Sequence, residues 1–225
     1  MKDLGSAFSF PFKDPNWPVK FLIGFGFMLL SLFVVGIFVL AGYFIQVTQR
    51  VMRGEHNAMP EWDDIGVKLI VGFKFCVAYL VYVLPIILIY IPFVIMTVLG
   101  QLVDPGDMGG TFAGMYMLAF GAIFVIVIPY GLLLTAVSPI ITYRFARNES
   151  IAEALDVREV FRDFKRNWQN TLIVALIATG IQSFAAIGVV VFIIGVFFTI
   201  FYSYLVTSHM YGLLGRDLHH EGVAA

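Results

Sequence analysis

Charged residues and cysteine are scarce in this chain of 225 residues. Only 13% of the residues are charged, 60% are hydrophobic, and Cys76 is the single cysteine. About a quarter of the residues in a soluble domain are charged, so this composition excludes a soluble globular domain. One cysteine excludes an internal disulfide framework, and the 23 phenylalanines exclude a disordered chain. The composition therefore predicts an integral membrane protein.

The sequence also lacks a basic excess and recognisable catalytic motifs. Lys and Arg number 14 against 15 Asp and Glu, which argues against a nucleic-acid partner. We find no nucleophile beside a general base, no glycine-rich phosphate loop and no His/Cys spacing typical of a metal site. The apolar regions are almost free of the ionisable residues that ion-coupled transporters and intramembrane enzymes use. We therefore expect no enzymatic activity, no cofactor and no metal.

Long apolar blocks dominate the chain. They lie at 19–45, 69–103, 111–143 and 171–207. The last three exceed the roughly 20 residues that one helical span requires, so tilting, kinking or division is expected. Proline removes a helix hydrogen bond and clashes with the preceding turn. Pro85 and Pro92 in the second block, and Pro129 and Pro139 in the third, therefore predict kinked or broken spans.

Two blocks leave the number of crossings open. The fourth is favoured as two packed helices, 170–186 and 188–210, with one protruding helix as the alternative. The first fits a tilted span, which we favour, or a re-entrant hairpin bent near Gly36. We expect a single membrane domain over 1–225 with about five spans.

Basic residues predict the orientation of the spans. Lys and Arg gather in 46–68 and 144–168, whereas 104–110 has none, so the first two segments are predicted to be cytoplasmic. Both contain a similar stretch: residues 50–55 and 144–149 each read Arg, two residues, Arg, then Gly or Asn, then Glu. Gly and Asn favour the left-handed cap of a helix. Either a duplicated unit or two ordinary helix ends explains this similarity, and both explanations put the segments on one side of the membrane.

The segment 150–168 has the pattern of an amphipathic helix lying in the membrane interface. Ser150 and Glu153 form a capping box, and apolar residues follow at spacings of three and four. Basic side chains near its end are candidates for binding anionic lipid headgroups. They are Arg158, Arg162, Lys165 and Arg166. The alternative is a connector helix that docks on its own bundle.

A short acidic segment precedes the second block. It consists of Pro60, Glu61, Trp62, Asp63 and Asp64. Proline suits the first position of a helix and carboxylates suit its positive end, so we expect a helix to begin at Pro60. Trp62 would then mark the headgroup level. Binding of a divalent cation by the three carboxylates is the alternative.

Small residues spaced by four predict close helix packing. They are Gly110, Gly114, Ala175, Thr179, Ser183, Gly195, Thr199, Ser203 and Thr207. Such stripes let backbones approach and let hydroxyls bond across an interface. We expect them to pack the bundle internally, with self-association as the alternative.

Several elements together resemble one known family. They are Phe10-Pro11, the run from Asp14 to Trp17, the approach from Gly42-Tyr43 to Arg50, Gly54 followed by the acidic segment 60–64, and the run from Phe201-Tyr202 to Gly212. This pattern resembles a bacterial and archaeal membrane family, the domain of unknown function numbered four thousand and thirteen. The resemblance implies a multi-span membrane protein without an enzyme-like site. It supplies no catalytic residues to transfer and leaves the function open.

These observations predict an all-α fold, a polytopic helical membrane bundle with kinked or broken spans and amphipathic interfacial helices. The expected role is membrane organisation, lipid interaction or scaffolding. Membrane lipids are the expected partners, together with a second copy of the chain or another membrane protein. A passive channel or a transporter for a lipid-like or neutral solute is the alternative. A surface enzyme would have to use Glu61, Asp63 and Asp64.

Overall fold

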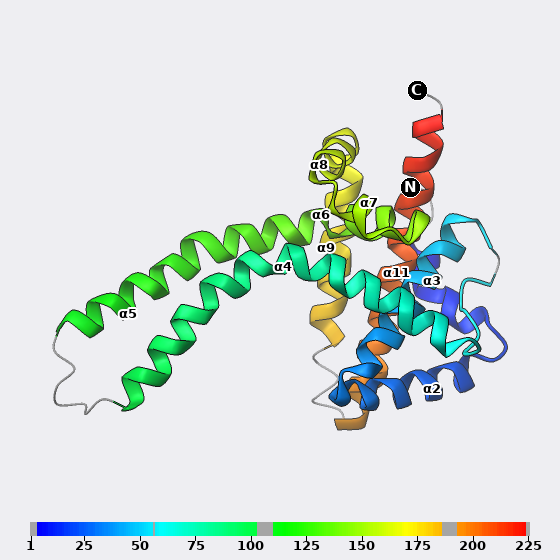
Figure 1. Cartoon of the computed structure of the whole chain (residues 1–225). Coiled ribbons are helices and arrows are strands. Elements are labelled where there is room, and N and C mark those ends of the chain that lie inside the picture. Colours follow the sequence, from blue (N-terminus) through cyan, green and yellow to red (C-terminus); the bar gives the residue numbers. More distant parts are fainter. Residues whose placement is uncertain (1–3, 56, 103–109, 186–192, 224–225) are drawn as a thin grey trace. The chain divides into compact units, whose positions relative to one another are not determined.

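The computed structural model describes residues 4–55, 57–102, 110–185 and 193–223, and every regular element within these ranges is a helix (Figure 1). The elements are α1 Ser6–Ser9, η1 Phe10–Lys13, α2 Trp17–Leu30, η2 Ser31–Phe33, α3 Val35–Met52, α4 Ile65–Leu102, α5 Gly110–Ala122, η3 Ile123–Val127, α6 Ile128–Asn148, α7 Ile151–Leu155, α8 Val157–Arg166, α9 Trp168–Ala185 and α11 Ile193–Val223. The all-α expectation is confirmed.

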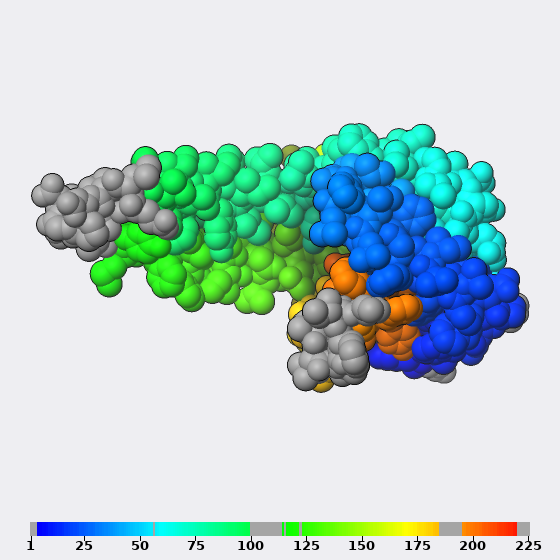
Figure 2. Space-filling view, turned by 90° about the horizontal axis from the view of Figure 1, so that it is seen from below, coloured from blue at the N-terminus to red at the C-terminus, as the bar shows by residue number. Residues whose placement is uncertain are grey.

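The chain forms two compact units. The first contains Met1–Ala78 and Ala136–Ala225, and the second contains Tyr79–Thr135. In the first unit α11 packs against α2, α3 and α9. Figure 2 shows the blue N-terminal helices lying against the orange part of α11. The core of this unit joins α3 and α11 through side chains such as Tyr43, Val47, Phe201 and Leu205.

The first apolar block does not form one continuous helix. It divides at Val34, whose φ of 65° lies in the left-handed region, and α2 and α3 meet there as a helical hairpin. The single tilted span that the sequence favoured is therefore wrong. The hairpin forms because Gly36 lets the turn close: a Cβ there would lie 2.3 Å from the backbone nitrogen of Ser31.

Glycines also bring α3 and α4 into backbone contact. A Cβ on Gly42 would lie 1.9 Å from the carbonyl oxygen of Lys68, and one on Gly72 would lie 1.7 Å from the carbonyl oxygen of Phe38. Any larger residue would have to separate the two helices. These glycines, of which the sequence analysis named only Gly42 as part of the resemblance, therefore allow the close approach of α3 and α4.

Three helical segments are long and apolar enough to cross a membrane. They are Val35–Met52, Ile65–Leu99 and Tyr116–Asn148, and the bent pair Ser6–Lys13 with Trp17–Phe33 would make a fourth. The sequence analysis expected about five spans, which is more than the three or four that the described residues provide. Two helices, α9 and α11, occupy the fourth apolar block on either side of 186–192, which lies outside the described residues.

The second unit consists of apolar helices with little internal core. The Tyr130 hydroxyl donates to the Tyr82 carbonyl at 2.8 Å, joining two of its segments. Its large apolar side chains are mostly exposed, among them Leu88, Met117, Leu118, Val125 and Leu132. An exposed apolar surface of this extent is typical of helices that face lipid or a partner.

The prolines of the two long apolar blocks do not all have the same effect. α4 continues through Pro85 and Pro92 without ending, and α6 continues through Pro139. In contrast, the third block changes to a π-helix at Ile123–Val127, just before Pro129. In a regular helix the proline ring would clash with the carbonyl four residues earlier, and a π-turn changes that register. The predicted interruption of the third block therefore takes the form of a wider turn.

Candidate functional site

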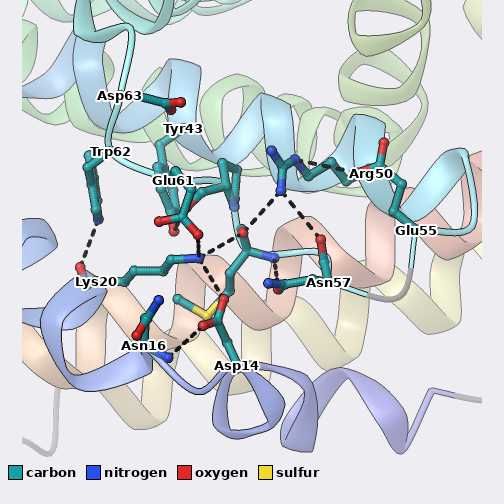
Figure 3. A network of polar contacts seen from close by, with 12 residues as sticks. Asp14, Asn16, Lys20, Tyr43, Arg50, Glu55, Asn57, Glu61, Trp62 and Asp63 are labelled. Atoms are coloured by element: carbon teal, nitrogen blue, oxygen red, sulfur yellow. Dashed lines mark hydrogen bonds and ion pairs between the residues drawn. The ribbon is translucent and has the colours of Figure 1, made fainter.

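The acidic segment 60–64 folds over Lys20, and Lys20 pairs with Asp14 and with Glu61 of this segment (Figure 3). The Lys20 Nζ donates to Asp14 Oδ2 at 2.6 Å and lies 2.6 Å from Glu61 Oε1. It also donates to the Met59 carbonyl at 3.2 Å. Lys20 is only 1% exposed and Asp14 is also buried, whereas the Glu61 side chain reaches solvent. A buried ammonium is thus paired on one side with a buried carboxylate.

Local turns hold this ion pair in place. Asp14 Oδ1 accepts the Asn16 amide at 2.8 Å, and the Asp14 carbonyl accepts the Trp17 amide at 3.1 Å. Pro18 stands in the first turn of α2, where its missing N–H costs nothing. These bonds begin α2 directly after Asp14, so that Lys20 points back toward the carboxylate (Figure 3).

The Trp62 ring packs over the site. The ring stacks on Tyr43 with centroids 4.1 Å apart and on Phe27 with centroids 5.1 Å apart. Its Nε1 donates to the Lys20 carbonyl at 2.9 Å. The buried Tyr43 hydroxyl donates to the Pro60 carbonyl at 3.1 Å. The acidic segment is thus fastened to both arms of the α2–α3 hairpin.

Arg50, in the last turn of α3, binds Met59, the residue just before the acidic segment. Its Nη1 donates to the Met59 carbonyl at 3.2 Å, the oxygen that Lys20 also uses. Its Nε lies 3.6 Å from Glu55 Oε2, and Arg53 donates to the other Glu55 oxygen at 2.7 Å. The Met59 carbonyl therefore joins the beginning of α2 to the end of α3.

The expectation that a helix begins at Pro60 is wrong, because α4 begins at Ile65. Residues 60–64 are extended or bent. Asp64 ends this stretch with a φ of 46°, and its carbonyl accepts the amides of Val67 and Lys68. The buried Lys68 Nζ donates to the Asp63 carbonyl and lies 3.6 Å from the Asp63 carboxylate. The contacts with Lys20 and Met59 keep this segment out of helical geometry.

The cation alternative for the acidic segment receives no support from its geometry. Glu61 pairs with Lys20 and Asp63 with Lys68. Within the described residues, no group of three or more His, Cys, Asp or Glu side chains could hold a metal ion. A lysine already occupies the position beside each of these two carboxylates.

The predicted interfacial helix 150–168 is two helices, α7 and α8, separated at Asp156. Ser150 Oγ accepts the Glu153 amide, as the capping box requires. The Glu153 carboxylate, however, accepts hydrogen bonds from Arg147 and Asn148. These bonds hold the pKa of Glu153 below its usual value. The break arises because Asp156 is itself an N-cap, its Oδ1 accepting the Glu159 amide at 3.2 Å.

α8 presents its basic side chains outward, while two of its acidic side chains, Glu159 and Asp163, pair with Arg144 of α6. All four candidate headgroup residues, Arg158, Arg162, Lys165 and Arg166, are exposed. Arg162 pairs with Glu159. Buried Arg144 of α6 lies 2.7 Å from Asp163 Oδ2 and donates to the Glu153 carbonyl at 3.0 Å. Val160 of α8 is buried, whereas Val157 and Phe161 are exposed.

The two similar basic helix ends lie side by side. Gln49 Nε2 donates to the Ala146 carbonyl at 2.9 Å and to Glu149 Oε1 at 3.0 Å, so the end of α3 contacts the end of α6. Gly54 takes the left-handed conformation, with φ 73°. At the end of α6, Glu149 takes the left-handed conformation, with φ 53°, because α6 continues through Asn148. The expectation that Asn148 caps α6 in this way is wrong.

The small-residue stripes show mostly bonds within a helix. The Thr179 hydroxyl donates to the Ala175 carbonyl and the Ser183 hydroxyl to the Thr179 carbonyl, all within α9. Nothing lies within 4 Å of a Cβ built on Gly114, and Gly110 has no described surroundings. In α11, Ser203 and Thr207 are buried, and the hydroxyl of Thr199 donates to the Gly195 carbonyl. The described hydroxyl bonds of α9 therefore do not cross a helix interface.

Sequence reasoning missed the partners of the acidic segment. Lys20, Tyr43 and Lys68 contact this segment and Asp14 pairs with Lys20, but these residues stand at block edges or inside apolar runs. The run Asp14-Pro15-Asn16 is a turn signal that could have marked the place where the chain folds back. No spacing rule could have paired Lys20 with Glu61, which is 41 residues away.

Comparison with known proteins gives one match. A family model described as "Protein of unknown function (DUF4013)" matches residues 25–198, well over half of the chain. It includes the acidic segment and α8 but not Asp14 or Lys20. No curated protein and no solved structure matches the chain.

Proposed function

Because the chain belongs to the DUF4013 family, whose function is unknown, we propose its role from the structure. The protein organises or scaffolds the membrane by binding anionic lipid headgroups through α8, and it acts as a binding protein rather than as an enzyme. The observation that carries this proposal is the set of four exposed basic side chains on α8. Lysine and arginine near an anionic membrane surface contribute about 1 kcal/mol each.

The attachment of α8 supports this role. The Arg144 ion pair with Asp163 and the burial of Val160 hold one face of α8 on the protein. Phe161 and Trp168 remain exposed beside the basic side chains. Apolar and basic side chains exposed together are typical of a helix lying at the lipid interface. The alternative of a connector helix is compatible with this role, because α8 can dock on its own bundle and still present a surface to lipid.

The paired carboxylates support a non-catalytic role. A surface enzyme would have to use Glu61 or Asp63 as a base or nucleophile, but each lies beside a lysine ammonium. We assign these side chains to holding the acidic segment on the α2–α3 hairpin.

We also propose that 46–68 and 144–168 lie on the cytoplasmic side. The bonds from Gln49 to Ala146 and Glu149 support a common side for the two segments. Their content of Lys and Arg supports the cytoplasmic side in particular.

The test is binding of a short-chain phosphatidylglycerol to the purified protein in neutral detergent, read as a shift of the thermal unfolding midpoint, with short-chain phosphatidylcholine as reference. The quadruple variant Arg158→Gln, Arg162→Gln, Lys165→Gln and Arg166→Gln should weaken binding of the anionic lipid at least tenfold. The matched control, Lys13→Gln with Arg53→Gln, also removes exposed charge and should leave binding unchanged.

Salt gives the second arm of this test. Exposed charges are screened by added salt, so binding to the wild type should weaken as ionic strength rises. Equal binding of the anionic lipid by the wild type and the quadruple variant would contradict the proposal, as would an equal loss in the control.

A further inference from the structure

The turn between α2 and α3 is unusually compact and carries apolar side chains outward. Leu32 is 79% exposed and Phe33 is 74% exposed, and Val34 and Val35 are also exposed. Between Phe21 and Ile45 only Ser31 and Tyr43 carry a polar side-chain group. The Ser31 hydroxyl is satisfied within the turn, since it donates to the Met28 carbonyl. This tip of the hairpin, residues 29–35, therefore offers no polar side-chain atom that requires water.

The backbone of the tip is also hydrogen-bonded. The Val34 amide donates to the Ser31 carbonyl at 3.0 Å, and the Ile37 amide donates to the Val34 carbonyl at 3.0 Å. Of the residues joining the two helices, Val34 alone leaves the right-handed helical region, with φ 65°. In hydrocarbon each unsatisfied backbone group costs several kcal/mol, so irregular chain facing lipid is normally excluded. The amides of Val34 and Ile37 are therefore satisfied within the turn, without water.

The opposite end of the hairpin is charged. Lys20, near the start of α2, and Arg50, near the end of α3, donate to the same Met59 carbonyl at 3.2 Å. Asp14 and Glu61 lie on Lys20 at that end. The hairpin thus has one polar end, where both arms meet the acidic segment, and one apolar end. Such a division matches a segment with one end at the membrane surface and the other in hydrocarbon.

The length of each arm fits this placement. α2 has 14 residues and α3 has 18, which at 1.5 Å per residue are roughly 21 Å and 27 Å long. The hydrocarbon core is about 30 Å thick. An arm that starts at the surface therefore ends within the core or at its far edge, without a polar segment to carry it into water.

We infer that residues 17–52 form a re-entrant hairpin that enters and leaves the bilayer by the same face, with the tip 29–35 in contact with lipid acyl chains. The segments before Trp17 and after Met52 then lie on one side of the membrane. The inference rests on the membrane location of the proposed function but not on headgroup binding by α8.

The test is accessibility of single cysteines to a membrane-impermeant maleimide, in vesicles of either orientation, with Cys76→Ser as the background. Asn16→Cys and Arg53→Cys, at exposed positions beside the two ends of the hairpin, should react from the same face. Leu32→Cys should react from neither face and become reactive after unfolding in detergent. Reaction of Leu32→Cys from the opposite face would overturn the inference, because α2 and α3 would then be two complete crossings. Reaction of Asn16→Cys and Arg53→Cys from opposite faces would also overturn it.

A spin label on Leu32→Cys distinguishes lipid from protein around the tip. Contact with acyl chains predicts relaxation by dissolved oxygen, which concentrates in hydrocarbon, and little relaxation by a water-soluble nickel chelate. Relaxation by the nickel chelate, or by neither agent, would overturn the inference. Phosphatidylglycerol binding measured on the same variants separates the two proposals: a misplaced tip with normal lipid binding refutes the hairpin alone, and loss of the protein from washed membranes refutes both.

Discussion

Replacement of Lys20 by methionine is expected to destabilise the first unit more than any surface substitution. Methionine keeps nearly the length and volume of the side chain but removes the ammonium that lies 2.6 Å from Asp14 Oδ2. Both side chains of this pair are almost fully buried. Breaking a buried ion pair by removing one partner costs about 3–5 kcal/mol, because the remaining charge is left without compensation. The expected fall in the free energy of unfolding is therefore about 3–5 kcal/mol.

A second substitution isolates the origin of that cost. In the double variant Asp14→Leu with Lys20→Met the uncompensated carboxylate is gone, and an apolar pair occupies the space. Such replacements are often nearly neutral, so the double variant should regain most of the lost stability. Glu61 should not reproduce the effect: its side chain is 55% exposed, and Glu61→Gln should cost less than about 1 kcal/mol.

The assay is chemical unfolding in mixed detergent micelles, followed by tryptophan fluorescence. Trp62 donates to the Lys20 carbonyl, so its emission reports on the site directly. Lys13→Met is the matched control, because it removes an exposed lysine seven residues away and should change stability by less than about 0.5 kcal/mol. A Lys20→Met variant within about 1 kcal/mol of the wild type, or a double variant as unstable as the sum of its single changes, would refute the reasoning.

Three further predictions concern packing, capping and pH. Gly42→Ala and Gly72→Ala should each lower the free energy of unfolding by about 1–3 kcal/mol, because the added Cβ would strike backbone; Gly66→Ala, with open space around it, is the control, and equal effects at all three positions would contradict the contact. Asp156→Ala should cost about 1 kcal/mol through loss of the α8 cap, measured by thermal unfolding, and Asp156→Asn should restore it. Because the pKa of Glu153 is lowered in the folded protein, its stabilising contribution should be present above the carboxyl's unfolded pKa and lost as pH falls through the folded value. Glu153→Gln should flatten that part of the stability profile, and an unchanged profile would contradict the assignment.

The sequence predicted the class of fold because that depends on composition and length. Scarce charge and long apolar blocks are properties of the chain itself, and the structure confirms an all-α protein. The cap at Ser150 is local in the same sense, since its bond to the Glu153 amide spans three residues. Asp156 caps α8 through the same chemistry, but the sequence analysis did not consider it as an N-cap. The predicted helix 150–168 was therefore too long.

The candidate site was only half predictable. The acidic segment 60–64 stood out, but its helical interpretation failed because Tyr43 and Lys20 bind the Pro60 carbonyl and the Glu61 side chain from other helices. The reversal in the first apolar block was offered only as the alternative bent near Gly36, and its position at Val34 was hidden, because a β-branched residue is a poor indicator of a left-handed turn. The acidic segment depends on contacts between residues distant in sequence, which local propensity does not report.

The packing of α11 on α3 has a consequence for the order of events during synthesis. Thr48 donates to the Ser208 carbonyl, 160 residues later in the chain, and Val51 lies where a Cβ on Gly212 would clash. At a translation rate of roughly 5–20 residues per second, α3 waits on the order of 10 s for this partner to be made. Throughout that time the face of α3 that carries Thr48 and Val51 is without its α11 neighbour. α11 is therefore the last element to complete the packing of α3.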